Sequence, residues 1–321
     1  MSHLIVTGAN GFVGRAVCRS ALEAGYTVTA LVRRSGECIE GVYEWVHDAA
    51  DFVNLDGGWP ADLAADCVIH LAARVHVMHD EAPDPDAAFD ATNVAGTLRL
   101  AEAARRHGVR RIVFASSIKA VGEGDGGTPL SEETSPDPQD AYGRSKLRAE
   151  RQLAAYGASA GLDVVVVRPP LVYGPAVRAN FLKMVDAVAR GMPLPLGAVA
   201  ARRSLVYVEN LADALLRCAT DPRAAGECFH VADDDAPSVT ALLRLVGDAL
   251  GKPARLVPIP PAMLRALGAL TGRRAMIDRL TGSLQLDTGR IRRVLDWRPP
   301  YTTRQGLDAT AAWYRSRDRQ Q

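Results

Sequence analysis

The chain has 321 residues, of which 23% are charged, and its formal net charge is +1. This balance gives no argument for binding nucleic acid or a membrane surface, and the length predicts two lobes. Five cysteines form no Cys-x-x-Cys pair, and no histidine has metal-ligand spacing, so we expect reduced thiols, a cytoplasmic location and no metal site. No apolar stretch approaches 18 residues, so no membrane insertion is expected.

Short apolar runs alternate with helical patterns along the first half of the chain. Strands are expected at residues 4–6, 27–32, 67–71, 112–115 and 164–167, and helices at 12–22, 85–107 and 141–160. This alternation predicts an α/β fold with a Rossmann-type, doubly wound parallel sheet. After Pro169-Pro170 the alternation loosens and Pro and Gly become frequent, which indicates a smaller, mixed α/β C-terminal lobe.

A glycine-rich segment, Thr7 to Gly14, connects the first expected strand to the first expected helix. Glycines at positions 8, 11 and 14 permit a tight turn and let the backbone approach a pyrophosphate. The N–H groups at the start of the helix favour negative charge there. The segment therefore predicts a dinucleotide site.

Three polar side chains are expected to meet at the same edge of the sheet. Ser117 follows a strand, and Tyr142 and Lys146 are four residues apart, so they share one face of a helix. The carboxyl ends of parallel strands converge on one crevice, where ligands bind. The charge of Lys146 is expected to lower the pKa of Tyr142 toward neutrality, which makes the phenol a usable proton donor and acceptor. Together with the glycine loop, these residues predict a nicotinamide-dependent oxidoreductase.

Over nearly its full length the chain resembles the extended short-chain dehydrogenase/reductase family of nucleotide-sugar epimerases, dehydratases and ketoreductases. Asp296 stands where the closing segment of that family usually has Gly. The matching pieces are Thr7-Gly8-x-x-Gly11-x-x-Gly14, Asp48, His70-Leu71-Ala72-Ala73, Asn93 to Thr97, Ser116-Ser117, Tyr142-x-x-x-Lys146, Arg168-Pro169, Val172 to Pro175, Asn180-Phe181, Arg203 to Val208, Asn210 to Asp213 and Val294 to Pro299.

The resemblance implies a role for each matching residue. Ser117 would hold the substrate oxygen, Tyr142 would move its proton, and Lys146 would also bind the nicotinamide ribose. Asn180 and Arg203 would bind the diphosphate of a UDP-sugar or another nucleotide sugar; Arg202 is the neighbouring candidate, and Asn180 has the alternative role of capping a helix at 181–190. The cofactor would contact Gly8, Asn10, Gly11, Phe12, Val13, Gly14, Asp48, Leu71, Ala72, Ala73, Tyr142 and Lys146.

The family also implies the lobe boundaries. Residues 1–170 and about 205–235 would form the dinucleotide-binding Rossmann domain, and about 171–204 and 236–321 the nucleotide-sugar lobe. Such proteins form homodimers, which we expect here as well.

Cofactor choice depends on the end of the second strand. Folds that select NAD place an acidic residue there, but this chain has Val32 followed by Arg33 and Arg34. A guanidinium can pair with a 2′-phosphate, so Arg33 favours NADP(H). NAD(H) remains the alternative, with the arginines as exposed loop residues.

The residues after Ser117 narrow the reaction. Sugar-nucleotide 4,6-dehydratases carry Asp-Glu there, whereas this chain has Ile118-Lys119, and Ile cannot protonate a leaving hydroxyl. Leu171 replaces an amide that contacts substrate in UDP-galactose 4-epimerases. The closer resemblance is to O-antigen reductases of UDP-4-keto-6-deoxy-N-acetylhexosamines, carried by Leu71 to Met78 and Ser116 to Lys119.

We therefore expect NADPH-dependent reduction at C4 for cell-surface polysaccharide synthesis. The alternative is a 4-epimerase of a UDP-hexose or UDP-N-acetylhexosamine. A more distant alternative is a non-catalytic NADP-binding sensor or assembly factor, although such relatives typically lose the Tyr or Lys that this chain retains.

Overall fold

The computed structural model describes residues 2–75, 84–272 and 274–318. A seven-stranded sheet has the order β3-β2-β1-β4-β5-β6-β9, and every neighbouring pair is parallel. The strand order reverses between β1 and β4, where a doubly wound sheet opens a crevice at its carboxyl edge. The strands are β1 (His3–Thr7), β2 (Thr27–Val32), β3 (Tyr43–Val46), β4 (Cys67–His70), β5 (Arg111–Ala115), β6 (Asp163–Arg168) and β9 (Cys228–His230).

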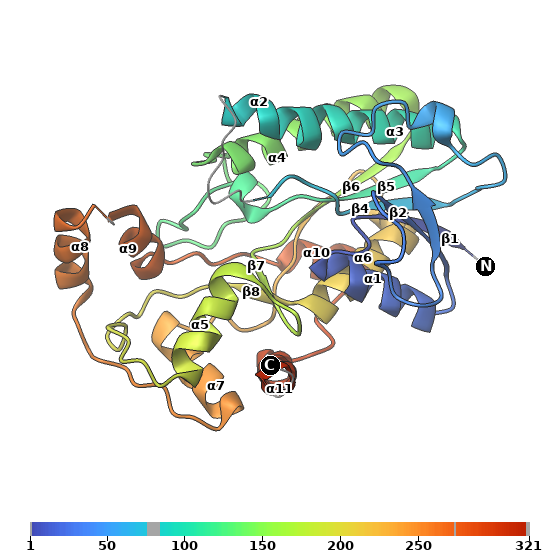
Figure 1. The fold of residues 1–321 in the computed structure, drawn as a ribbon. Coiled ribbons are helices and arrows are strands. Elements are labelled where there is room, and N and C mark those ends of the chain that lie inside the picture. The colour runs from blue at the N-terminus through green and yellow to red at the C-terminus, as the bar shows by residue number, and fades with distance from the viewer. Residues whose placement is uncertain (1, 76–83, 273, 319–321) are drawn as a thin grey trace.

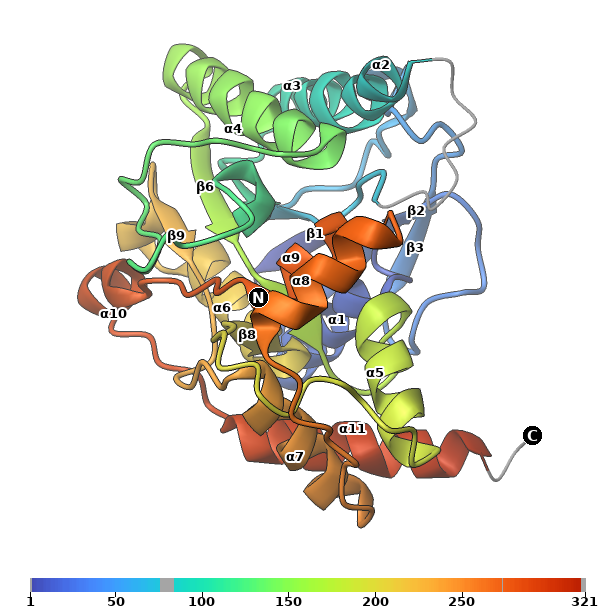
Figure 2. The same ribbon diagram turned by 90° about the vertical axis from the view of Figure 1, so that its left-hand side faces the viewer.

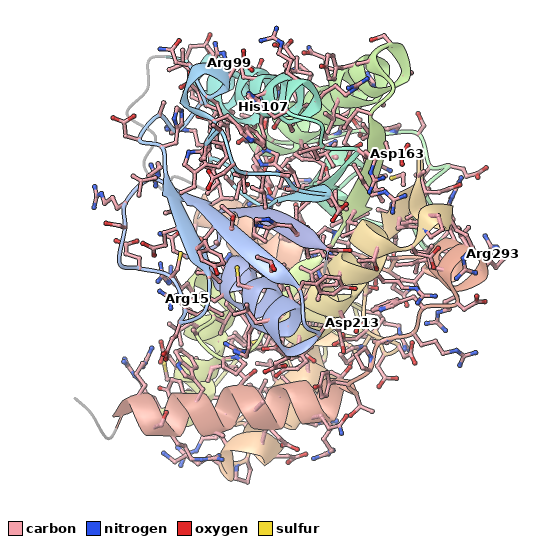
Figure 3. The ribbon with its side chains drawn as sticks, turned by 90° about the vertical axis from the view of Figure 1, so that its right-hand side faces the viewer. Arg15, Arg99, His107, Asp163, Asp213 and Arg293 are labelled. Carbon is pink, nitrogen blue, oxygen red and sulfur yellow. The ribbon has the colours of Figure 1, made fainter. Side chains whose placement is uncertain are left out.

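Helices cover both faces of this sheet, which confirms the predicted α/β class (Figure 1). On one face, α1 (Phe12–Glu23) packs against α6 (Val208–Thr220). On the other face lie α2 (Pro85–Asp90), α3 (Gly96–Arg106) and α4 (Ala141–Ala160). Figure 3 shows the two layers, with Arg99 of α3 on one side of the sheet and Asp213 of α6 on the other.

The two cores follow from the alternation of side chains along a strand. Leu4 and Val6 belong to the core under α1 and α6, whereas Ile5 belongs to the core under α3 and α4. All three are at most 1% exposed, as the short β-branched runs of a doubly covered sheet predict.

The expected helix at 85–107 is interrupted. Between α2 and α3 the chain forms a π-helical turn, η2 (Ala91–Ala95), and Asn93 within it is 1% exposed. Single π turns of this kind are frequent at functional sites. The helix expected at 141–160 forms with those bounds, because the Asp140 side chain accepts a hydrogen bond from the Gly143 N–H and Gly161 ends it in a left-handed conformation.

The second half of the chain contributes a two-stranded parallel sheet and most of the remaining helices. This region also returns to the first, because β9 pairs with β6 and α6 lies beside α1. The division into lobes at about residues 170, 205 and 235 stays a prediction. The elements are β7 (Leu171–Tyr173), β8 (Leu205–Tyr207), α5 (Ala179–Ala189), α7 (Val239–Leu250), α8 (Pro261–Leu270), α9 (Arg274–Thr281), α10 (Gly289–Leu295) and α11 (Thr303–Asp318).

In the closing segment, Asp296 stands where the family usually has Gly, and its backbone conformation shows why Gly is usual there. Asp296 ends α10 with φ of 54° and ψ of 25°, the left-handed conformation for which Gly is the usual residue. The next side chain, Trp297, is 5% exposed and donates a hydrogen bond to Asp213 of α6 at 2.6 Å. Within the described part of the chain, no helix is long and apolar enough to cross a membrane.

Candidate active site

The glycine loop has the geometry of a phosphate cradle. Gly8 has φ of +66°, and the Gly11 N–H donates to the Gly8 carbonyl at 2.9 Å. A Cβ on Gly14 would lie 2.1 Å from the Gly8 oxygen, so no larger residue fits where α1 crosses the loop. The helix starts at Phe12 without an acidic residue in its first turn. Its free N–H groups therefore suit the pyrophosphate of a dinucleotide, with Asn10, Phe12 and Val13 completing the loop.

The segment after β4 is hydrogen-bonded to Thr7 at the start of this loop. The Thr7 hydroxyl oxygen accepts the N–H groups of Leu71 and Ala72 at 3.1 and 3.0 Å, and it donates to His70 Nδ1 at 2.7 Å. A Cβ on Gly8 would lie 3.0 Å from the Ala72 nitrogen, which again requires glycine. The predicted cofactor residues 71–73 and the glycine loop therefore lie together.

His70 continues these contacts into the core beneath the site. Its Nε2 hydrogen-bonds the Thr97 hydroxyl at 3.0 Å, and Thr97 donates to the Asn93 carbonyl at 2.7 Å. This network assigns the proton of the ring to Nε2. Burial, and then the charge of Lys146, lowers the pKa of His70 to about 3. His70 is therefore a neutral structural residue.

Ser117 and Tyr142 meet at the carboxyl edge of the sheet. Ser117 follows β5 in an extended conformation, and its hydroxyl oxygen accepts the Lys119 N–H at 3.2 Å. Its side chain also hydrogen-bonds Tyr142, in the first turn of α4. A Cβ on Gly143 would lie 2.4 Å from the Lys119 carbonyl, so glycine after the tyrosine permits this close approach.

Lys146 lies one turn further along α4 and is 2% exposed. Its Nζ donates to the Ala115 carbonyl at 2.8 Å and lies 4.4 Å from the centre of the Phe114 ring and 5.9 Å from that of Tyr142. Burial lowers the pKa of Lys146 to about 7, and the nearby Glu150 acts in the opposite direction. The structure thus brings Ser117, Tyr142 and Lys146 together.

One electrostatic expectation is wrong for this structure. Burial, followed by the charge of Asp140, raises the pKa of Tyr142 above its ordinary value, and only the Ser117 hydrogen bond opposes them. The sequence predicts the opposite, a pKa lowered by Lys146. Burial outweighs that effect because it disfavours the phenolate and also reduces the charge on Lys146 itself.

A buried acid behind the three residues has no counterpart among the sequence predictions. Glu150, 5% exposed, accepts two hydrogen bonds from Arg168 at 3.0 and 2.6 Å and a very short one from the Ser116 hydroxyl. Ser116 precedes Ser117, and Glu150 lies one turn beyond Lys146. The spacing from Lys146 signals a shared helix face, but a glutamate at that spacing is usually exposed. Glu150 therefore ties the helix of Tyr142 and Lys146 to the strand ends beside Ser117.

The two residues after Ser117 both make contacts within the protein. Ile118 is 3% exposed and packs with Val121 and Leu284, so this position offers no acid for dehydration. Lys119 forms ion pairs with Asp140 at 2.5 Å and Glu123 at 3.1 Å. Because Asp140 caps α4, Lys119 helps to fix the start of the helix that carries Tyr142.

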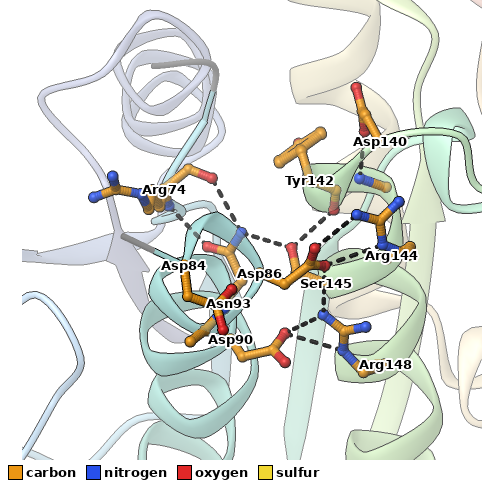
Figure 4. Close-up of polar contacts among 12 residues, drawn as sticks. Arg74, Asp84, Asp86, Asp90, Asn93, Asp140, Tyr142, Arg144, Ser145 and Arg148 are labelled. Carbon is orange, nitrogen blue, oxygen red and sulfur yellow. Dashed lines mark hydrogen bonds and ion pairs between the residues drawn. The ribbon is translucent and has the colours of Figure 1, made fainter. Parts of the chain in front are cut away.

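Asn93 in the π turn hydrogen-bonds two other segments near the site, as Figure 4 shows. The Asn93 amide accepts the Arg74 N–H at 2.8 Å and donates to the Arg74 carbonyl and the Ser145 hydroxyl, both at 3.0 Å. Ser145 in turn donates to the Tyr142 carbonyl at 2.8 Å. Asn93 therefore connects the segment after Ala73 with the backbone at Tyr142.

At the expected adenosine end, Arg33 and Asp48 are exposed beyond β2 and β3. A carboxylate also lies close to the loop: the Asn10 amide donates to Glu37 at 2.6 Å, and Arg15 bonds the Glu37 carbonyl. Sequence reasoning missed Glu37 because it lies five residues beyond Val32, in a loop rather than at the strand end.

The two predicted diphosphate ligands differ in environment. Burial lowers the pKa of Arg203, and its Nη2 is buried without a hydrogen-bond partner in the described structure. An anion would satisfy that nitrogen. Arg202 is exposed. Asn180 is exposed in the first turn of α5 and is not the N-cap, which is Arg178.

Two other expectations concern the loop after β4 and metal binding. Within residues 2–75, 84–272 and 274–318, no group of three His, Cys, Asp or Glu side chains is arranged to hold a metal ion. His76, Val77 and Met78, the end of the segment that resembles O-antigen reductases, lie outside the described residues. An open cavity of about 740 Å³ lies between α4, β6 and β9, away from Ser117 and Tyr142.

Similarity to known proteins agrees with this site. Residues 4–232 match the NAD dependent epimerase/dehydratase family. The chain is 38% identical to a UDP-glucose 4-epimerase of Vibrio cholerae, over 96% of this chain and 94% of that protein. It is 26% identical, over the same shares, to the N-acetyl-alpha-D-glucosaminyl-diphospho-ditrans,octacis-undecaprenol 4-epimerase of Escherichia coli O157:H7.

A solved relative shares the whole architecture. The UDP-glucose 4-epimerase of Thermus thermophilus, solved as a complex with NAD, has a TM-score of 0.77 at 25% identity and covers 98% of this chain and 99% of its own. With the glycine cradle and the Ser, Tyr and Lys side chains in place, the chain belongs to the NAD-dependent epimerase/dehydratase family of enzymes, with the extended short-chain dehydrogenase/reductase fold.

Proposed function

We propose that this enzyme interconverts the C4 epimers of a UDP-hexose or UDP-N-acetylhexosamine. The observation that carries the proposal is the meeting of Ser117, Tyr142 and Lys146 at the carboxyl edge of the sheet. Similarity to a 4-epimerase over 96% of the chain supports it. The 4-ketoreductase favoured by the sequence is not confirmed, and the relatives favour its alternative.

The chemistry that we assign to the chain is the removal of a proton from the C4 oxygen and its later return to the same oxygen. Tyr142 takes the proton of the C4 hydroxyl, and Ser117 donates a hydrogen bond to the same oxygen as its charge changes. A bound nicotinamide cofactor supplies the hydride acceptor and donor. After the keto-sugar has turned, Tyr142 returns the proton to the oxygen. Tyr142 takes the first proton as the phenolate, which burial disfavours; a protonated Lys146, whose Nζ lies 5.9 Å from the centre of the Tyr142 ring, would offset part of that cost.

Arg203 is the proposed ligand of the substrate diphosphate. Its buried Nη2 without a partner in the described structure is the contact that a phosphate oxygen would complete. Asn180, exposed in the first turn of α5, is the second proposed ligand of the diphosphate. Both come from the region that we assign to substrate binding.

The cofactor preference is proposed separately from the reaction. Val32 and Arg33 favour NADP(H), whereas the Glu37 carboxylate beside Asn10 would repel a 2′-phosphate. We retain NADP(H), because Arg33 is exposed at the strand end, where the 2′-substituent of a bound dinucleotide is expected.

The second candidate is reduction of a pre-formed UDP-4-keto-6-deoxy-sugar. The specific observation is Leu171, which is 50% exposed where UDP-galactose 4-epimerases carry an amide. A reductase would release NADP⁺ after each cycle, whereas an epimerase must keep its cofactor through both half-reactions.

The deciding experiment uses the purified protein with catalytic amounts of cofactor. UDP-glucose, UDP-N-acetylglucosamine and their C4 epimers are incubated separately, and the sugars are followed by chromatography while NADPH absorbance is recorded. Interconversion without net NADPH consumption is expected, and Tyr142→Phe is the matched inactive control. A parallel assay supplies excess NADPH and a UDP-4-keto-6-deoxy-sugar; stoichiometric NADPH oxidation there, with no interconversion in the first assay, would establish the reductase instead.

A further inference from the structure

An apolar stripe on α8 faces solvent. Met263, Leu267 and Leu270 are 62%, 59% and 85% exposed, and their spacing of four and three residues places them on one face of the helix. Single exposed apolar side chains need no explanation, but a continuous stripe on one helix marks an interaction surface.

The stripe is not the result of a loosely attached helix. Leu264 and Gly268 of α8 are buried, so another face of the same helix packs against the protein. The neighbouring α9 packs on α8, and its Ile277 contacts the main core. The two helices, which we call the α8–α9 hairpin, therefore have an attached face and a separate apolar face.

The hairpin is also basic. Residues 261–281 contain four arginines and one acidic residue, Asp278. Arg274 and Arg265 have side chains that are 78% and 52% exposed, and both share Asp278 at 3.6 and 3.7 Å. Ion pairs with Asp278 and Glu123 balance part of this charge, but four arginines against one acid leave the hairpin net positive. Exposed leucines beside a net positive charge are the composition of helices that lie on anionic membrane surfaces.

The hairpin stands out from the rest of the protein on the side toward which the strands point their carboxyl ends (Figure 1). Figure 2, viewed from that side, shows α8 and α9 in front of the chain. The hairpin lies near the proposed diphosphate site, because Arg279 forms an ion pair with Glu123 at 2.8 Å and the backbone of Arg203 forms a β-bridge with Leu284, three residues after the end of α9.

A second copy of the chain is the competing occupant, since the homodimer stays a prediction. A stable interface needs about 800 Å² from each partner, more than three side chains on a ten-residue helix supply. Two hairpins of the same positive charge would also repel each other. An anionic bilayer satisfies both the arginines and the apolar stripe.

We propose that the α8–α9 hairpin binds the surface of an anionic phospholipid bilayer, with Met263, Leu267 and Leu270 among the headgroups and Arg265 and Arg274 on the phosphates. The helix lies along the surface and does not span the membrane. The consequence is that the substrate site opens close to the membrane. This proposal does not depend on which C4 reaction the enzyme performs.

The test is co-sedimentation of the full chain with vesicles. Binding is expected to phosphatidylglycerol/phosphatidylcholine vesicles at about 150 mM salt, to fall at higher salt, and to be absent with phosphatidylcholine alone. The double substitution Leu267→Glu and Leu270→Glu should weaken binding at least about tenfold, because it removes two apolar contacts and adds two negative charges. The matched control, Tyr43→Glu with Val53→Glu, adds the same charge at other exposed apolar positions.

Three results would overturn the proposal. They are no sedimentation with anionic vesicles, equal losses in the test and control variants, and a dimer in solution that only the hairpin variant dissociates. Should the double variant fail to fold, Arg274→Glu at an exposed position replaces it and must still weaken binding. Turnover of UDP-sugars without vesicles is measured in parallel, so a failure of membrane binding is distinguishable from a failure of the proposed reaction.

Discussion

Replacing Glu150 by Gln tests whether the buried acid organises the active site. Gln keeps the shape and one acceptor but leaves Arg168 charged, with its side chain only 9% exposed. Nη1 of Arg168 already has no partner in the described structure. Burial alone would lower the pKa of Arg168, but the hydrogen bonds and charge of Glu150 raise it above its ordinary value. The guanidinium thus stays charged and depends on this carboxylate.

The expected loss of stability follows from the burial of both partners. Removing one charge from a buried pair costs about 3–5 kcal/mol, and because Gln retains one hydrogen bond we expect about 3 kcal/mol. Urea unfolding followed by circular dichroism measures this. The control is the double variant Glu150→Met with Arg168→Met, which removes both charges and should lose less than Glu150→Gln alone.

The same substitution should change the pH profile. Burial already lowers the pKa of Lys146 to about 7, and Glu150 is the nearby charge that raises it. Without that charge the pKa falls further, so activity that needs protonated Lys146 should decline at lower pH than in the unmodified enzyme. Unchanged urea midpoint and unchanged alkaline limb in Glu150→Gln would refute this reasoning.

Three further predictions address the acid, the cofactor and the closing segment. Tyr142→Phe should lose at least about a hundredfold in turnover while fluorescence titration still shows cofactor binding, whereas Lys146→Met should weaken both; near-normal activity of Tyr142→Phe would reject the chemistry. Arg33→Ala should reduce the preference for NADP(H) over NAD(H) by about 1–3 kcal/mol in calorimetric titrations, and equal affinities in the unmodified protein would contradict Arg33 as a phosphate ligand. Asp296→Val should lower the free energy of unfolding in urea by about 1–2 kcal/mol, because a β-branched residue resists φ of 54°. Asp296→Gly should change it by no more than about 0.5 kcal/mol. Similar values for both variants would show that the backbone conformation is not the cause.

The fold was predictable where the signals are local. The bounds of α4 follow from Asp140 and Gly161, a start signal and a stop signal that the sequence itself displays. Strand β3 (Tyr43–Val46) was missed because it lies at the sheet edge with mostly exposed side chains, so no apolar run marks it. The π turn was missed because its cause is tertiary: Asn93 bonds Arg74 and Ser145, which lie 19 and 52 residues away.

The same contrast between local and tertiary signals applies to the residues of the site. The grouping of Ser117, Tyr142 and Lys146 was predictable because each has a fixed place at a strand end or on a helix; their catalytic roles stay a prediction. Glu150 and Arg168 were not predictable, because nothing in the sequence shows that a glutamate and an arginine 18 residues apart are both buried. The predicted lowering of the Tyr142 pKa was wrong for the same reason, because the desolvation that raises this pKa depends on all the side chains packed around the ring.

The choice between epimerase and reductase lies outside these three residues. Both proposed reactions would move the same proton at C4 through Tyr142 and Ser117, so the acid–base geometry carries no information about which occurs. The reactions differ in whether the keto-sugar turns and whether the cofactor leaves. Turning requires the diphosphate to stay bound while the sugar rotates, which places the difference at Arg203 and around Leu171. Retention of the cofactor between the two hydride transfers would depend on the residues proposed to bind it: the glycine loop, Arg33 and the neighbouring Glu37. Substitutions there, rather than in Ser117, Tyr142 or Lys146, should therefore convert one activity toward the other.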